Sequence, residues 1–157
     1  MMKSSVTNSQ GFTLTELMLV LLLTALLATS GRLMWQDIRQ QLQLTETATQ
    51  LQLFLIGVRE YANSRNRDLT LRVITTDSGW CVDARPDPIT APCNRRGRLV
   101  WQAPYPDIRL LSVSGEPGFF GRRNLARGGN IAFGPAQVPW RVVVSSRARI
   151  RICQEAC

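Results

Sequence analysis

The residues with the clearest chemical potential lie near the N-terminus, where a glycine precedes a long apolar run. Gly11 stands before Phe12, and residues 12–31 contain a single carboxylate, that of Glu16. An acid inside a membrane span costs roughly 2.5–3.5 kcal/mol, so a lone one marks a candidate functional site. A cut after Gly11 would leave Phe12 with a free amine, about 6 Å along a helix from Glu16. We therefore expect Glu16 to pair with such an amine on a neighbouring chain.

A second group of charged residues lies near the C-terminus, where arginines alternate with apolar residues. The arginines are Arg147, Arg149 and Arg151. On a strand their guanidinium groups would all face one way, away from the apolar side chains. Such a row suits salt-dependent, sequence-independent contacts to a DNA backbone. The alternative is an amphipathic strand with a merely solvated polar face. Four more arginines could extend the patch: Arg122, Arg123, Arg127 and Arg141.

The four cysteines allow three disulfide pairings. Pairing Cys81 with Cys93 would close a short proline-containing loop, and we favour it. It leaves Cys153 to pair with Cys157 across a tight turn, whereas a crossed pairing would tie the C-terminal tail to the sheet. No pair has the C-x2-C spacing of a zinc site, so structural disulfides are the better interpretation. They indicate an oxidising compartment such as the periplasm.

The overall composition bounds the classes of function. The 157 residues leave room for one small domain, and the net charge of +8 favours acidic partners such as nucleic acid or anionic lipid headgroups. The chain has no histidine, which excludes histidine-dependent triads and histidine metal sites. No nucleophile–base pair, carboxylate dyad or phosphate-binding loop is evident. We expect no enzymatic activity and no cofactor.

A long N-terminal helix must position the first group of residues. Residues 12–31 would span about 30 Å as a helix, enough to cross the hydrocarbon core of a bilayer. Beyond them, apolar residues recur in steps of three and four, with a weak polar patch at residues 45–50. We expect one helix from Phe12 to about Asn63, ended by the polar cluster 63–68. The expected stripe is Trp35, Ile38, Leu42, Leu51, Phe54 or Leu55, Val58, and Tyr61 or Ala62.

After the helix the period changes to two, and glycine and proline clusters separate short apolar runs. The expected strands are residues 69–73, 79–82, 98–101, 108–111, 131–133, 140–144 and 149–152. The expected turns include residues 85–92, 104–106, 115–118 and 134–135. We expect the four tryptophans to lie in the core.

These elements predict an α+β fold, with a long N-terminal helix packed on a small antiparallel β-sheet domain. The first half of the helix would be transmembrane. The expected divisions are a leader at 1–11, a transmembrane or filament-core helix at 12–31, its amphipathic continuation at 32–63, and a periplasmic β-domain at 64–157.

The N-terminal pattern resembles the class III signal of type IV prepilins and pseudopilins. The matching residues are Gly11, the run Phe12–Leu14, and Glu16; Thr15 stands where an apolar residue is commoner. The resemblance implies that prepilin peptidase, a membrane aspartyl peptidase, cuts between Gly11 and Phe12 and N-methylates Phe12. It also implies that Glu16 serves filament assembly.

The rest of the chain is similar to the prepilin peptidase-dependent protein A family of minor pilins, within the pseudopilin H and FimT-like group. The match includes Trp80–Cys81, the pattern between Phe119 and Phe133, and the final strands, but it is poor over residues 83–118. It implies assembly with other minor and major pilins in the bacterial inner membrane, or at the pilus tip. DNA-binding relatives carry Gly-Arg-x-Arg near the C-terminus, and here Ala148 replaces that glycine.

The sequence therefore predicts a minor pilin that helps to initiate type IV pilus assembly after processing. Two alternatives remain open: a DNA-binding minor pilin for DNA uptake, and a minor pseudopilin of type II secretion. Neighbouring genes would distinguish a pilus from a secretion system.

Overall fold

The computed structural model describes residues 13–86, 93, 97–122 and 125–154, without the side chains of residues 28–34. The chain divides into two compact units between Gln40 and Gln41. One helix, α1 (Leu14–Arg65), provides the first unit and the beginning of the second. The expected start at Phe12 lies outside the described residues. No helix in the described part of the chain is long and apolar enough to cross a membrane.

The C-terminal end of α1 has a specific local cause. Asn66 adopts a left-handed conformation, with φ of 50°. Its amide donates to the Asn63 carbonyl at 3.4 Å, and the Arg67 amide donates to the Ala62 carbonyl at 3.1 Å. This is a Schellman motif, in which asparagine can take the position that glycine usually occupies. The helix therefore ends inside the predicted polar cluster, at Arg65 rather than at Asn63.

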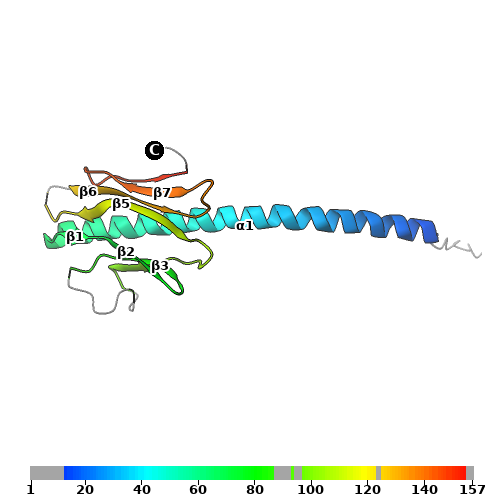
Figure 1. Ribbon diagram of the computed structural model, residues 1–157, viewed down its shortest axis with the longest axis horizontal. Coiled ribbons are helices and arrows are strands. Elements are labelled where there is room, and N and C mark those ends of the chain that lie inside the picture. Colours follow the sequence, from blue (N-terminus) through cyan, green and yellow to red (C-terminus); the bar gives the residue numbers. More distant parts are fainter. Residues whose placement is uncertain (1–12, 87–92, 94–96, 123–124, 155–157) are drawn as a thin grey trace, which may run out of the picture. The chain divides into compact units, whose positions relative to one another are not determined.

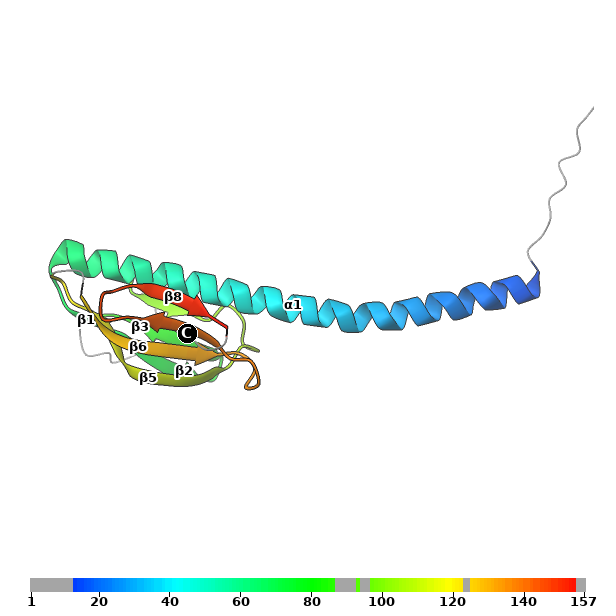
Figure 2. The same cartoon turned by 90° about the horizontal axis from the view of Figure 1, so that it is seen from above.

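Eight strands follow α1 in the described residues: β1 (Leu69–Thr70), β2 (Arg72–Thr76), β3 (Gly79–Asp83), β4 (Val100–Gln102), β5 (Leu110–Phe119), β6 (Ala126–Phe133), β7 (Trp140–Val144) and β8 (Ile150–Cys153). Five form one sheet in the order β1-β5-β6-β7-β8, and three form a second in the order β2-β3-β4. All these pairings are antiparallel. In the second unit the strands lie along α1 (Figure 1), and Figure 2 shows them on one side of this helix. The predicted α+β class is confirmed.

One expected strand proves to be two. The run predicted at 69–73 changes partner at Leu71, so that β1 pairs with β5 while β2 pairs with β3. The Leu71 amide donates to the Pro117 carbonyl at 2.9 Å, the bond at which the change occurs. Alternation of apolar residues continues across this point, so a period-two pattern cannot reveal a change of sheet.

The turn predicted at residues 115–118 is wrong, because β5 continues through it. The β5–β6 register shifts between Gly115 and Gly118, as in a β-bulge. Gly115 has φ of 72°, and a Cβ added at Gly118 would lie 2.7 Å from the Leu69 carbonyl oxygen. These glycines therefore serve a bulge and a close approach to β1 rather than a reversal of the chain.

The core forms where a stripe of α1 packs against the strands. Its fully buried helix residues are Leu44, Thr47, Ala48, Leu51, Leu55, Val58 and Ala62. The predicted stripe is confirmed from Leu51 onward but wrong before it, since Trp35, Ile38 and Leu42 are exposed. Steps of three and four backward from Leu51 lead to Ala48 and Leu44, through the patch expected to be polar. The Thr47 hydroxyl is satisfied by donating to the Gln43 carbonyl at 2.7 Å.

Three of the four tryptophans lie in the core, as expected. Trp80, Trp101 and Trp140 are buried, whereas Trp35 is 63% exposed. Trp80 and Trp101 form an edge-to-face pair with ring centroids 5.0 Å apart. The Trp80 indole N–H donates to the Ile108 carbonyl at 2.9 Å. This aromatic pair joins neighbouring strands β3 and β4 on their core side.

Candidate functional sites

The processing site itself lies outside the described residues, but Glu16 lies within them. Glu16 is exposed in the first turn of α1. Its amide donates to the Thr13 hydroxyl at 3.4 Å and to the Thr13 carbonyl at 3.1 Å. Thr13 thus acts as the N-cap, and Thr-x-x-Glu is the spacing of a capping box. The carboxylate also lies where the helix dipole favours negative charge. Sequence reasoning missed this role of Thr13, although the Thr-x-x-Glu spacing signals it.

Next to Glu16, α1 carries an extended apolar surface. Its exposed apolar side chains are Leu14, Leu17, Met18, Leu19, Val20, Leu21, Leu22, Leu23, Leu26 and Leu27. Contiguous apolar surface of this kind marks an interaction with other proteins or with lipid. This segment therefore requires an apolar environment that the described chain does not supply.

The three C-terminal arginines line one groove. Arg147, Arg149 and Arg151 are exposed and share a groove of about 380 Å³ with Ser145 and Ser146. A groove lined by guanidinium and hydroxyl donors can hold an anion such as a phosphodiester. The three arginines share one groove, and the predicted strand geometry fails only for Arg147.

The expected strand began at Arg149, but β8 begins at Ile150. Arg147 belongs to the hairpin loop between β7 and β8. The Ser145 amide donates to the Arg149 carbonyl, and the Ala148 amide donates to the Ser145 carbonyl, each at 2.9 Å. Ala148 is left-handed, with φ of 56°. This is the three-residue hairpin loop that ends in a left-handed position, for which glycine is preferred. Arg149 pairs with Ser145 at the base of this loop and shares a face with Arg151 by strand alternation, so the loop itself places only Arg147.

The other arginines considered for the patch have different surroundings. Arg141 on β7 is opposite Cys153, two register steps beyond the pair of Val143 with Arg151. Arg127 forms an ion pair with Glu116 at 3.6 Å and lies over the Phe120 ring. Arg122 is exposed, and Arg123 lies outside the described residues. Arg141 therefore lies on the face that carries Arg151.

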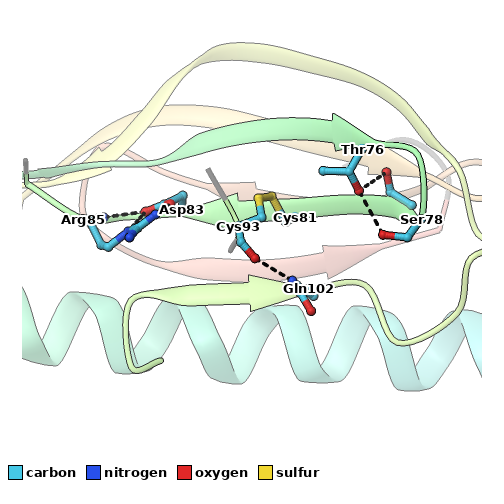
Figure 3. Close-up of a disulfide and its surroundings, with 8 residues drawn as sticks. Thr76, Ser78, Cys81, Asp83, Arg85, Cys93 and Gln102 are labelled. Atoms are coloured by element: carbon cyan, nitrogen blue, oxygen red, sulfur yellow. Dashed lines mark hydrogen bonds and ion pairs between the residues drawn. A yellow bond between two sulfur atoms is a disulfide. The ribbon is translucent and has the colours of Figure 1, made fainter. Parts of the chain in front are cut away.

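A disulfide joins Cys81 on β3 to Cys93, with the Cα atoms 6.2 Å apart (Figure 3). The Cys93 carbonyl accepts a hydrogen bond from the Gln102 side chain at 2.7 Å, which ties the loop to β4. Cys153 is also disulfide-bonded. Cys157, its expected partner, lies outside the described residues. Both contacts are made by Cys93, the disulfide to β3 and the hydrogen bond to β4.

An ion pair that sequence reasoning missed lies beside this disulfide. The Asp83 carboxylate is fully buried and accepts from the Arg85 guanidinium, with a shortest N–O distance of 2.6 Å (Figure 3). It also accepts from the Arg85 amide at 3.0 Å. Burial raises the pKa of Asp83, but the hydrogen bonds and charge of Arg85 outweigh burial and hold that pKa below its usual value. The pair therefore stabilises the ionised acid at the end of β3.

The described residues contain no group of three or more histidine, cysteine, aspartate or glutamate side chains that could hold a metal ion. The carboxylates that the structure places in defined contacts serve structural roles. Glu46 on α1, for example, accepts a hydrogen bond from the Tyr105 hydroxyl, which raises the pKa of Tyr105. That bond links the segment before β5 to the helix.

Comparison with protein families finds one match. Residues 6–31 match the prokaryotic N-terminal methylation motif, which is characteristic of type IV pilin-like proteins. No curated protein matches the chain, and no solved structure matches it. The matched residues include Gly11, Phe12 and Glu16, and the β-domain lies outside the match.

Proposed function

We propose that this protein is a minor pilin that takes part in initiating type IV pilus assembly after cleavage by prepilin peptidase. The methylation motif at residues 6–31 carries the proposal. The motif supports cleavage between Gly11 and Phe12, with N-methylation of Phe12. Glu16, exposed in the first helical turn, is then available to pair with the amine of a neighbouring subunit.

The exposed apolar surface between Leu14 and Leu27 supports this function. Burial of a leucine side chain is worth about 1.5–3 kcal/mol, so such a segment has a large driving force to leave water. In the proposed life cycle it lies in the bacterial inner membrane before assembly and among other pilins afterwards. The β-domain lies in the periplasm, where the disulfides form. The partners are prepilin peptidase and the other minor and major pilins.

Deleting the gene and imaging surface pili tests this function. We expect the deletion strain to have few or no pili, and complementation with wild-type protein to restore them. Complementation with a variant reversed in charge at Arg147, Arg149 and Arg151 should restore them equally. Normal numbers of pili in the deletion strain would contradict a role in assembly.

The arginine groove favours a second candidate function, binding of DNA during its uptake. Arg147, Arg149 and Arg151 converge on one groove with two serine hydroxyls. Log affinity falls as log salt concentration rises, and each phosphate contact makes this slope steeper by about 0.9. Charge reversal of the three arginines should therefore weaken DNA binding by the full chain in detergent and flatten this slope. Unchanged affinity at low salt would eliminate the groove as the site.

A further inference from the structure

Side chains of α1 form hydrogen bonds to the backbone of the β7–β8 hairpin, which carries the arginine groove. The Arg59 side chain donates from Nη1 to the Ala148 carbonyl oxygen at 3.2 Å. Seven residues earlier on α1, the Gln52 side chain donates to the carbonyl of Ile150, two residues after Ala148, at 3.3 Å. Both carbonyls belong to the segment that carries Arg149 and Arg151. Side chains of α1 therefore hold the backbone of this segment at two points.

The hairpin needs this support because Ala148 adopts an unfavourable backbone conformation. A left-handed conformation costs a residue with a Cβ roughly 1–2 kcal/mol. Ala148 has φ of 56° and is only 2% exposed. Within the loop, the Ser145 hydroxyl accepts from the Arg149 amide at 3.2 Å. A strained residue persists where its surroundings over-determine it, and the bond from Arg59 supplies the constraint from outside the loop.

The positive charge of Arg59 is paired with a carboxylate next to the hairpin. Its guanidinium forms an ion pair with Glu60 at 3.0 Å, and its side chain is 29% exposed. A second groove of about 310 Å³ is lined by Arg59, Glu60, Asn63, Arg147 and Ala148, so Arg147 lines both grooves. Because Glu60 offsets the charge of Arg59, this second groove presents less positive potential than the three-arginine groove.

We infer that Arg59 is a positioning residue for the arginine groove, acting on the anion through the Ala148 backbone rather than by touching it. This inference rests on the anion-binding function proposed as the second candidate. Holding Ala148 sets the directions of Arg147 before it and Arg149 after it. A groove ordered in advance binds more tightly, because binding then loses less conformational freedom. The ligand class is a polyanion with phosphodiester groups.

The test measures binding of a fluorescein-labelled DNA duplex to the full chain in detergent micelles, by anisotropy at several salt concentrations. Arg59→Met removes the donors and keeps the aliphatic stem. We expect it to weaken binding by about five- to tenfold, the worth of a typical hydrogen bond, with an unchanged salt slope. Arg59→Lys retains a charged donor and should recover most of the affinity.

Arg98→Met is the matched control, since Arg98 is exposed and lies on the connection to β4. It removes one positive charge at a distance in sequence from the hairpin and should change affinity much less than Arg59→Met. Equal effects of the two substitutions would overturn the positioning role. A salt slope reduced by about 0.9 in Arg59→Met would overturn it too, because Arg59 would then contact phosphate directly.

A separate result would show that the second candidate function, DNA binding by the arginine groove, is wrong. If the chain reversed in charge at Arg147, Arg149 and Arg151 binds the duplex as well as wild type, the groove is not an anion site, whatever Arg59 does. Thermal unfolding by circular dichroism accompanies each variant. If Arg59→Met is partly unfolded at the binding temperature, Arg59→Gln replaces it with the same expected loss of affinity and the same criteria.

Discussion

Two segments of α1 bury their apolar side chains to opposite extents. Between Leu44 and Ala62 a stripe of apolar residues is completely buried within the second unit, whereas between Leu14 and Leu27 apolar side chains are exposed all around the helix. Helix propensity alone gives little stability, and most of it comes from tertiary packing. The first segment therefore depends on surroundings outside the chain, and the second on the chain's own sheets.

Substitutions in the two segments should therefore be detected by different measurements. In the second segment a lost side chain lowers the free energy of unfolding. In the first segment the same loss leaves folding of the β-domain unchanged and appears in processing or assembly. Four predictions separate these outcomes, and three of them use a matched residue on α1.

The largest expected effect is on processing. Gly11→Val should abolish cleavage by prepilin peptidase, because a branched side chain replaces the glycine at the proposed cut. The measurement is migration of the protein on a denaturing gel in cells that contain the peptidase. Gly57→Ala, at an exposed helix position with open space around its Cα, is the control and should be cleaved normally. A mature-sized band for Gly11→Val would refute the proposed site.

Glu16→Ala should be inserted and processed but should assemble poorly. Loss of a charge-assisted contact worth about 1.5–3 kcal/mol should lower incorporation roughly tenfold or more. Counting surface pili and immunoblotting sheared filaments measure the effect. Asp37→Ala removes a carboxylate further along the same helix and should leave pilus numbers near wild type. Equal numbers of pili for Glu16→Ala and wild type would count against the pairing role.

Two leucines of α1 provide the matched test in the second segment. Leu55 is fully buried, and Leu53, two positions away, is 61% exposed. Leu55→Ala should lower the free energy of unfolding by about 3 kcal/mol, through lost burial and the cavity left behind. Leu53→Ala should change it by less than about 0.5 kcal/mol. Urea unfolding of the full chain in detergent, followed by circular dichroism, measures both, and similar midpoints would disprove the packing described for α1.

The smallest expected effect concerns Asp83. Asp83→Asn should lower the free energy of unfolding by about 2 kcal/mol at neutral pH, because its hydrogen bonds with Arg85 lose the negative charge of the acceptor. The pKa of Asp83 is lower in the folded state than the ordinary value of 3.8, so folding favours the ionised form. Its contribution is complete above that ordinary value and is lost as the pH falls through the lower folded-state pKa.

Unfolding midpoints measured between neutral pH and acid test this dependence. The wild-type chain should lose stability below about pH 4 more steeply than Asp83→Asn, since only the wild type has this carboxylate to protonate. Parallel curves for the two proteins would show that Asp83 does not contribute through its charge.

Local patterns were sufficient to predict the elements whose causes are local. The apolar run after Gly11, the polar cluster at the helix end and most strand positions follow from periodicity and from punctuation by glycine and proline. The hydrophobic phase of a helix is equally local, and the prediction failed there because the stripe was extended through Leu42 and Ile38 instead of through Ala48 and Leu44. A threonine can be buried when its hydroxyl bonds to the preceding turn, as it does to Gln43.

Only the tertiary structure decided which distant residues meet. The division into two sheets at Leu71 and the bond from Arg59 to the Ala148 carbonyl leave no periodic trace. The sequence by itself determined that arginines would gather near the C-terminus and that a lone acid would follow Phe12. The surroundings of these residues depend on contacts between segments far apart in the chain. Such contacts contribute to stability only when the chain has folded.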